Sequence, residues 1–483
     1  MTSRLRALVF GVLVVLSSAV VEAAPVLEIM GAANSIQPFT ARVVGTGAAV
    51  SYFNPALLPY QPNRFGLDFL AALGRLRIDY ESRPPGSDIS AEIYDALPVG
   101  GESAGRSFRP LPTDKLRSPR GHHDPSQTDL YLAIGSTKPF LDGRLAFGLY
   151  ALFPLQRFQA HRPFFNDERE QYFSNSLRFE LFEDRLEIAG FVFGFGGRPL
   201  EWLSLGAGLT LWSSTVAHTE LFVPDAGNQQ KNEINSTTEI TFSVVPHFGL
   251  SVSPWRGLRL TSTVHLAAQS GVDGRSDLQF WRYDYPEGES SLIKDFEFAY
   301  GYLPLRVSAG VAWFEEQEEG PSWSAALSVL WAMWSDYRDR HKGKTDPRWS
   351  DTVTIAASGE VSFREHRAGL SLSWVPTPVP ESRGRRNYVD NDRVGVALGW
   401  ESSFDLGRVA IGGGLNVQAQ WLIPRRVVKD PTLIPDEFPE SDHVLTGERI
   451  ASSIGLQSNN PGYPGFRSSG VIVGLGASFH LEF

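Results

Sequence analysis

Cysteine is absent from all 483 residues of the chain. Neither a disulfide framework nor a thiolate metal site can therefore form, although an oxidising compartment stays compatible with such a sequence. Positive charge is also scarce, since 44 Lys and Arg stand against 54 Asp and Glu and give a net charge of −10. A nucleic-acid partner is disfavoured, because phosphate binding needs clustered excess Lys and Arg. No motif predicts a cofactor.

Long apolar runs are missing as well, with one exception near the first residue. Arg4 and Arg6 precede an apolar run from Ala7 to Leu16, and a pattern of small residues suited to cleavage follows before Ala24. This arrangement predicts a signal peptide over residues 1–23. A single membrane anchor is the alternative, but the run is shorter than the roughly 20 apolar residues that a spanning helix needs.

The last thirteen residues alternate strictly between two kinds of side chain. Odd positions from Val471 to Phe483 are apolar, whereas even positions are small or polar except at Ile472. Such a strand is typical of the closing strand of a bacterial outer-membrane barrel, with the apolar face toward lipid and the small face toward the lumen. We expect barrel-assembly machinery to recognise the strand that ends in Phe483. The mean hydropathy of −0.16 does not conflict, because alternation hides a membrane face from any average.

The same period of two recurs along most of the chain, and no segment has a sustained helical period. Turn residues such as Gly, Pro, Asp and Asn separate the alternating runs. We predict strands at Phe65–Tyr80, Asp129–Phe140, Arg144–Leu155, Leu186–Gly197, Leu203–Trp212, Leu258–Ala268, Leu305–Trp313, Trp323–Tyr337, Val353–Phe363, Arg367–Trp374, Val394–Phe404 and Val409–Ile423.

Tryptophans gather near the ends of these runs, and in a barrel they would form the aromatic girdles at the two membrane interfaces. The alternative is that they are core aromatics of a soluble β-sandwich. The tryptophans concerned are Trp202, Trp212, Trp255, Trp281, Trp313, Trp331, Trp334, Trp349, Trp374, Trp400 and Trp421. Glycines inside strands indicate lumen crowding or strand bending, at Gly194, Gly196, Gly206, Gly208 and Gly412–Gly414.

Long polar insertions, rich in Pro, Gly, Asp, Glu and Arg, separate some of the strands. Outer-membrane barrels have long loops on the cell exterior and short turns on the periplasmic side, so we expect extracellular loops here. The insertions are Glu81–Gln127, Phe158–Gln171, Val223–Ser236, Arg338–Asp351 and Val427–Ser469.

Residues 24–64 do not fit the strand pattern and carry the sequence GTGAAVSYFNPALLPY at Gly45–Tyr60. This stretch resembles the N-terminal plug of the FadL/TodX family of outer-membrane transporters for long-chain fatty acids and other hydrophobic compounds. The Asn-Pro-Ala motif of that plug is matched by Asn54, Pro55 and Ala56.

Further segments resemble strands of the same family and follow in the same order. They are LAFGLYALFPLQ (Leu145–Gln156), LSLGAGLTL (Leu203–Leu211), HFGLSVSPWRGLRLTSTVHLAAQ (His247–Gln269), YLPLRVSAGVAW (Tyr302–Trp313) and WSAALSVLWAMWSDYRD (Trp323–Asp339). The resemblance implies an all-β fold: a transmembrane antiparallel β-barrel of about 14 strands, within a range of about 12 to 16. Residues 24–64 would plug the lumen and residues 65–483 would form the barrel with its long extracellular loops.

The function that the resemblance implies is passive uptake of hydrophobic molecules, above all long-chain fatty acids, through an apolar lumen pocket with lateral release into the membrane. A proline removes a donor from the strand ladder, so Pro154, with Phe153 and Leu155, is our candidate for the wall distortion. The alternative is a proline at the rim, where the strand ends. The family usually has glycine at the position of Leu155.

Phe53, Asn54, Pro55 and Ala56 are the matching candidates in the plug for ligand binding or gating. An Asn-Pro pair also suits any turn, because Asn bonds the neighbouring backbone and Pro fixes φ. Two basic residues, Arg42 and Arg64, could pair with a fatty-acid carboxylate, or they could be solvated turn charges. The expected partners are hydrophobic small molecules, outer-membrane lipid and lipopolysaccharide.

Two other functional classes stay open, a porin for small polar solutes and a barrel enzyme or surface-binding protein that acts through its loops. The chain has no Gly-x-Ser-x-Gly elbow, and Gly343–Thr345 lacks the upstream glycine of a phosphate loop. A metal could bind at His122–Asp124, and a divalent cation at the acidic cluster of Glu315, Glu316, Glu318 and Glu319. Hydrated loops are the alternative for both.

Overall fold

The computed structural model describes most of the chain. The residues described are 25–32, 35–85, 87, 121–124, 126–156, 178–179, 189–223, 233–281, 289–317, 320–338, 343–434, 436, 456, 458 and 460–483. The predicted signal peptide and the predicted insertion Phe158–Gln171 lie outside these residues. No helix among the described residues is long and apolar enough to cross a membrane.

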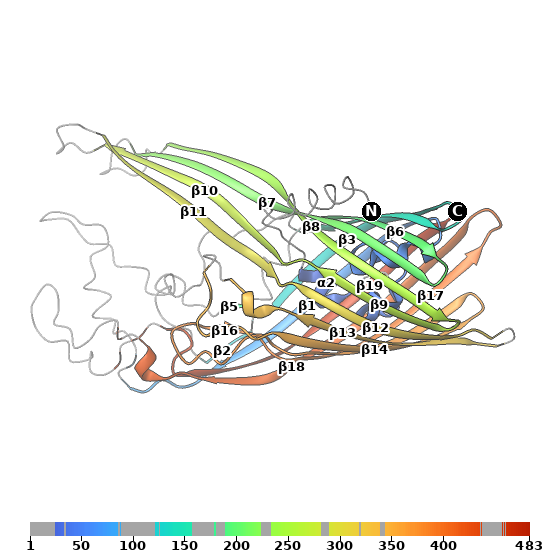
Figure 1. Cartoon of the computed structure of the whole chain (residues 1–483). Coiled ribbons are helices and arrows are strands. Elements are labelled where there is room, and N and C mark those ends of the chain that lie inside the picture. The colour runs from blue at the N-terminus through green and yellow to red at the C-terminus, as the bar shows by residue number, and fades with distance from the viewer. Residues whose placement is uncertain are drawn as a thin grey trace, which may run out of the picture.

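Fourteen strands of the described chain close into an antiparallel β-barrel (Figure 1). Closure follows from β1, which pairs with β19 along one edge and with β3 along the other. In order around the barrel, the strands are β1 (Arg64–Tyr80), β3 (Ser126–Phe140), β4 (Leu145–Pro154), β6 (Gly190–Leu200), β7 (Leu203–Val223), β8 (Glu233–Trp255), β9 (Leu258–His265), β12 (Arg306–Glu315), β13 (Ser322–Ala332), β14 (Thr352–Phe363), β15 (His366–Val375), β17 (Arg393–Asp405), β18 (Ala410–Val428) and β19 (Gly465–Glu482). The expected number of strands is confirmed.

The alternation of side chains sets which face of the wall each residue occupies. On β19, Leu475 and Phe479 are exposed on the outer face, whereas Gly474 and His480 are buried on the inner face. Ile472 breaks the pattern in the sequence and is 3% exposed, because it packs inside the barrel. The outer surface is therefore a band of exposed apolar side chains, as the period of two predicts.

The two ends of the barrel differ. Short connections such as Leu141–Arg144, Glu201–Trp202 and Arg256–Gly257 join strands at one end, which we call the short-turn end. At the other end, here the long-loop end, β7 and β8 continue as a long hairpin, and so do β10 (Ala268–Trp281) and β11 (Glu289–Leu303) (Figure 1). There β10 pairs with β7 in parallel, whereas nearer the short-turn end β9 pairs with β8.

Shorter elements complete the described chain. They are β2 (His122–His123), β5 (Arg178–Phe179), β16 (Tyr388–Val389), α2 (Pro25–Met30), η1 (Pro38–Thr40), α3 (Ala41–Val44), α4 (Val50–Phe53), η2 (Pro55–Tyr60), η5 (Trp334–Asp336) and η6 (Pro431–Leu433).

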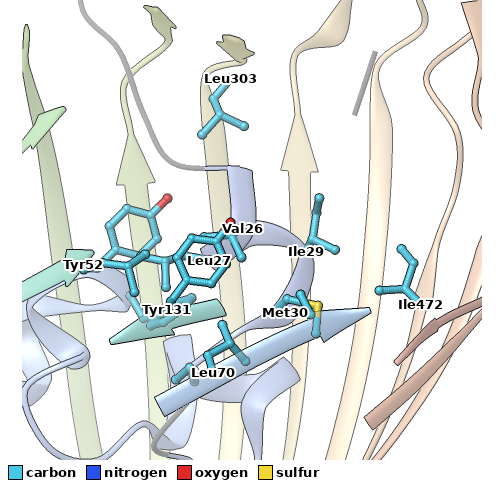
Figure 2. Close-up of a cluster of buried hydrophobic side chains, with 14 of the residues drawn as sticks. Val26, Leu27, Ile29, Met30, Tyr52, Leu70, Tyr131, Leu303 and Ile472 are labelled. Atoms are coloured by element: carbon cyan, nitrogen blue, oxygen red, sulfur yellow. The ribbon is translucent and has the colours of Figure 1, made fainter. Parts of the chain in front are cut away.

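The hydrophobic core sits inside the barrel rather than between layers. Helix α2 lies within the ring of strands, and its Val26 and Leu27 pack with Tyr131 of the wall (Figure 2). Tyr52 of α4 joins the same cluster. The chain from Pro25 to Gln61, called the N-terminal segment below, thus supplies a large part of the core, and the strands supply the rest.

Several sequence expectations need correction. The strand expected at Trp323–Tyr337 ends at Ala332, and the 3₁₀ helix η5 begins at Trp334. The insertions expected at Val223–Ser236 and Val427–Ser469 are shorter, because β8, β18 and β19 extend into them. Strands β10 and β11 were not expected at all over most of their length. Their sequences do alternate in part, with Phe296, Phe298 and Tyr300 at alternate positions of β11, so a usable signal was present there.

The proposed aromatic girdle is only partly correct. Trp202, Trp255 and Trp421 are exposed on the outer surface, in keeping with a girdle. Three other tryptophans are buried instead. Trp212 packs in the core against Gly190, and Trp334 and Trp349 belong to an aromatic cluster at the long-loop end.

Candidate functional site

The lumen wall is lined by glycines where the N-terminal segment lies against it. A Cβ at Gly206 would collide with the backbone nitrogen of Ala56, and one at Gly249 with the Asn54 side chain. The residues that we call the glycine wall, on strands β4, β6, β7 and β8, are Gly148, Gly194, Gly196, Gly206 and Gly249. Crowding in the lumen therefore explains these glycines, as the sequence predicts for three of them.

Asn54 fixes the turn that meets this wall. The residue is fully buried, and its Oδ1 accepts a hydrogen bond from the Ala56 amide at 3.1 Å. Its Nδ2 donates to the Arg42 carbonyl at 2.9 Å. Pro55 starts the 3₁₀ helix η2 that Asn54 caps, and its preset φ suits that position. The Ala56 carbonyl accepts from Ser204 Oγ of the wall at 2.7 Å, so the motif joins two parts of the segment to the barrel.

A buried ion cluster of Glu28, Arg42, Tyr52 and Arg306 lies further along the segment. Arg42 Nη2 lies 2.7 Å from both carboxylate oxygens of Glu28, and Tyr52 donates its hydroxyl to Oε1 at 2.6 Å. Arg306, the first residue of β12, forms a second ion pair with Glu28 and donates to the Tyr52 hydroxyl at 3.2 Å. One carboxylate thus serves two guanidinium groups.

Charge balance in this cluster has two consequences. Burial raises the pKa of Glu28, but the guanidinium groups of Arg306 and Arg42 outweigh it and hold that pKa at about 2. The cluster keeps a formal excess of one positive charge. Among the described residues, Arg306 Nε and Nη2 and Arg42 Nε have no hydrogen-bond partner. Buried N–H groups of this kind favour a further anionic or carbonyl acceptor.

Two stacked histidines of the wall border the cluster. The rings of His247 and His265 lie 4.9 Å apart and nearly parallel, with an interplanar angle of 9°. His247 Nε2 donates to the Ser51 carbonyl at 2.6 Å, and the Tyr52 ring meets His265 edge-on at 5.0 Å. Strand β8, which carries His247, and strand β9, which carries His265, therefore both contact α4 from one side.

Amide side chains of β18 hold α2 from the opposite side. Gln420 Nε2 donates to the Ile29 carbonyl at 2.7 Å and Gln418 Nε2 to the Met30 carbonyl at 2.8 Å. These carbonyls belong to the last turn of α2, where the helix offers them no partner. The segment is therefore bound by hydrogen bonds here and by close packing at the glycine wall.

Arg64 is buried and only 11% of the Arg42 side chain is exposed, which contradicts the interpretation of solvated turn charges. Arg64 is 7% exposed and lies 3.7 Å from Glu482 and 3.9 Å from Glu401. Its Nη2 also lies 2.6 Å from His480 Nδ1. Arg64 therefore belongs to an ion network of the wall near the short-turn end.

A cavity of about 60 Å³ lies beneath α2 beside the ion cluster. Leu27, Phe39, Phe53 and Leu330 line its apolar part, and Arg42 reaches it from α3. A pocket for a small organic ligand usually measures about 300 to 1,000 Å³. This cavity is thus too small for a long acyl chain, and of the plug candidates Phe53–Ala56 only Phe53 lines it.

Pro154 is the last residue of β4. It pairs with Tyr131 of β3, whereas the pairing of β4 with β6 ends at Leu152 and Gly190 among the described residues. The Phe153 ring meets Phe191 of β6 edge-on at 5.5 Å, and Leu155 is exposed. Pro154 therefore stands at the end of β4, where the facing residues that precede β6 lie outside the described chain, and it lies apart from the Asn-Pro-Ala turn.

The other candidate sites are surface features. His122 Nε2 lies 3.7 Å from Asp124 with both side chains more than half exposed, and no group of His, Asp and Glu among the described residues could hold a metal. Glu315 accepts from Trp313 Nε1, and Glu316 pairs with Arg256. Glu318 and Glu319 lie outside the described residues. Lys344 of the Gly-Lys-Thr tripeptide lies 3.7 Å from Asp336.

Sequence reasoning missed Glu28, Arg306 and the histidine pair. The sequence did hold a signal for the wall residues. Titratable side chains at lumen-facing positions of alternating strands are His247, His265 and Arg306. Glu28 lies in a short segment without a period, so no pattern could have indicated its partner.

The fold and the lumen define a class of protein. It is a closed fourteen-stranded barrel with an apolar outer surface, and its lumen holds the N-terminal segment of its own chain. No family model and no curated protein matches the sequence. Among solved structures, the chain is similar to a Pseudomonas aeruginosa FadL homologue, with 13% identity over 96% of this chain and 98% of that one and a TM-score of 0.49. It is also similar to the P. putida toluene transporter TodX, with 13% identity over 94% and 99% and a TM-score of 0.48.

A third similar structure is the Ralstonia pickettii toluene transporter TbuX, with 10% identity over 96% of this chain and 99% of that one and a TM-score of 0.44. At such identities these similarities concern the path of the chain alone. They involve the same family that the sequence motifs resemble.

Proposed function

We propose that the protein is an outer-membrane channel for passive uptake of hydrophobic molecules, with residues 24–64 as its plug. The single observation that carries the proposal is the pairing of an apolar outer surface with a lumen packed by the N-terminal segment. An apolar band of this kind suits a bilayer. A porin for polar solutes would need a water-filled lumen instead, whereas among the described residues the N-terminal segment packs against the glycine wall.

The size of the cavity indicates how the channel works. A long acyl chain does not fit about 60 Å³, so part of the N-terminal segment has to move before a ligand can pass. Helix α2 is held by side-chain contacts, namely the hydrogen bonds from Gln418 and Gln420 and the ion pair of Glu28 with Arg306. The turn at Asn54 is held by packing against backbone. We infer that α2 moves and that the turn stays in place.

Long-chain fatty acids are the ligand class that we propose. Each methylene that leaves water contributes about 0.8 kcal/mol, so an apolar path favours long chains. The free N–H groups of Arg306 and Arg42 would bind the carboxylate at the edge of the cavity. A neutral hydrocarbon such as toluene would leave these groups unsatisfied.

Lateral release into the membrane is part of the same proposal. We expect the wall to open at the end of β4, next to Phe153, Pro154 and Leu155. Pro154 cannot donate a ladder hydrogen bond, which makes that edge easier to separate. The cell address, the signal peptide and recognition of Phe483 by assembly machinery remain predictions from the sequence.

Uptake by liposomes tests the function. Refolded protein would be reconstituted, and entry of a labelled long-chain fatty acid, toluene, a sugar and a salt would be measured side by side. Fatty-acid uptake that depends on the protein, without sugar or ion leakage, is the expected result. Sugar or ion flux without selective fatty-acid uptake would instead make the protein a porin.

Removal of residues 24–64 provides the matching control. The shortened barrel should leak sugar and ions if the segment is a plug, whereas a porin or a loop-based enzyme would behave as before. A folded barrel, checked by its circular dichroism and its resistance to detergent, is required for either result to count.

A further inference from the structure

We propose a binding site for the phosphate groups of an outer-leaflet glycolipid, such as those of lipopolysaccharide, on the outer wall of the barrel. The site consists of Arg75 and Arg77 on β1, Arg467 on β19 and Arg426 on β18, which we call the arginine patch. It rests on the proposed position in the outer membrane, with the long-loop end outward.

The three strands are neighbours and all four side chains point outward. Arg75 and Arg77 share the parity of Phe65, Leu67 and Phe69, which are exposed on β1. Arg467 likewise shares the parity of the exposed residues Leu475 and Phe479 on β19.

A register shift aims Arg426 at the same surface. The pairing of β18 with β19 shifts between Leu422 and Arg425, so that outward positions change from odd to even numbers. Arg426 is consequently 66% exposed, while its neighbour Val427 is buried. Bulges commonly re-aim a side chain in this way. Without the shift, the guanidinium would point into the lumen.

The patch places like charges directly opposite each other. Arg426 is the register partner of Arg467, and an opposed pair of equal charges destabilises a sheet. Arg77 pairs with Asp79, and Arg426 with Glu81 at 2.6 Å. Arg75 has no ion pair among the described residues, and Arg467 lies opposite Asp79 on β1, a carboxylate that it shares with Arg77. Four guanidinium groups and two carboxylates leave a net charge of two positive units. A phosphate monoester carries up to two negative charges, so it could neutralise the patch.

The height of the patch on the barrel fits a headgroup. Ten residues separate Phe65, at the short-turn end, from Arg75, which corresponds to roughly 33 Å along a strand. A strand tilt of about 40° reduces this to about 25 Å along the barrel axis, which is the typical height of the apolar band of an outer-membrane barrel. Arg75 therefore lies where acyl chains end and headgroups begin. Arg467 and Arg426, at the level of Asp79, lie about 10 Å further out along the axis. Arginine suits phosphate because its planar fork donates two parallel hydrogen bonds.

Binding of lipid A tests the site directly. Folded full-length protein in detergent would be titrated with diphosphorylated lipid A and with its phosphate-free form, and dissociation constants would be measured by native mass spectrometry. We expect the double variant Arg75→Gln, Arg467→Gln to bind the phosphorylated form roughly thirtyfold more weakly, at about tenfold per 1.4 kcal/mol and about 1 kcal/mol per arginine. Arg75→Lys, Arg467→Lys should lose less, since charge is kept.

The control variant Arg364→Gln, Arg408→Gln removes the same charge from exposed residues at the short-turn end and should bind like the wild type. Equal binding of phosphate-free lipid A, or unchanged binding by the patch variant, would overturn the site. Inorganic pyrophosphate that binds as tightly as the lipid would overturn it too. Fatty-acid uptake into liposomes without glycolipid should be the same for all variants, so the failure of either proposal is visible separately.

Discussion

Glu28 of the N-terminal segment and Arg306 of the barrel wall form an ion pair inside the lumen, with Arg42 bound to the same carboxylate. The pair joins the moving part of the proposed plug to a fixed strand. Charge, not shape alone, therefore holds α2 in its place.

Substitution of Glu28 by Gln should loosen this connection. Two buried guanidinium groups would then face each other without a carboxylate, and removal of one partner of a buried pair typically costs about 3 to 5 kcal/mol. We expect faster trypsin cleavage after Arg42 and a lower midpoint of unfolding in urea. Glu316→Gln is the control, because Glu316 pairs with Arg256 on the exposed surface. Equal cleavage of both variants would contradict the role of the cluster.

The same carboxylate predicts a dependence on pH. The pKa of Glu28 is held at about 2 in the folded protein, against 4.5 for an ordinary Glu. A lowered pKa stabilises the folded state above pH 4.5, and this contribution is lost as the pH falls toward 2. Hydrogen exchange of the α2 amides should therefore accelerate over that interval in the wild type. In Glu28→Gln this acceleration should be absent, and a parallel rise in both proteins would argue against Glu28 as the cause.

Asn54→Ala should weaken the turn at the glycine wall. The variant removes the cap of η2 and leaves the buried Ala56 amide without its acceptor, at a cost of about 1 to 3 kcal/mol. Thermal unfolding in detergent measures the loss. Asp430→Ala is a matched control, since Asp430 caps η6 in the same Asx-Pro arrangement on the loop side. A loss no larger than that of the control would reduce Asn54 to an ordinary turn residue.

A methyl group on the glycine wall should displace the segment. Gly206→Ala would bring Cβ into the backbone of Pro55 and Ala56, which cannot yield as a flexible side chain does. Overpacking of this kind costs typically about 1 to 3 kcal/mol. We expect ion conductance in planar bilayers to rise. Gly74→Ala on β1 is the control, because a Cβ there meets nothing within 4 Å. Silent bilayers for both would show that the wall tolerates the methyl.

Pro154→Ala distinguishes a lateral opening from a plain strand end. The variant restores an N–H at the end of β4. If release occurs there, fatty-acid uptake should fall several-fold while thermal stability stays the same or rises. Uptake equal to that of the wild type would mean that β4 simply ends at the proline.

The sequence predicted the barrel well, because alternation is a local property and most strands carry it on the outer face. Prediction failed where a residue is positioned by a distant partner. Trp212 has the spacing of a girdle residue, but it turns into the core against Gly190. Arg42 looked like a turn charge, since Glu28 and Arg306 are brought to it only by the folded lumen.

The Asn-Pro-Ala turn could be predicted from the sequence only in part. Its local geometry followed from the residue types, because Asn bonds the neighbouring amide and Pro starts the 3₁₀ helix. Its contact with Ser204 could not be predicted, because Ser204 lies on strand β7, far along the chain, and no sequence pattern links it to the turn.

The glycine wall also carries a consequence for evolution. At Gly206 and Gly249 the strand backbone itself is the complementary surface, so neither side can change alone. A homologue with a side chain at either position would need a different turn in place of Asn54–Ala56. These positions should therefore covary across related sequences, and the wall glycines would identify which N-terminal segment a given barrel accepts.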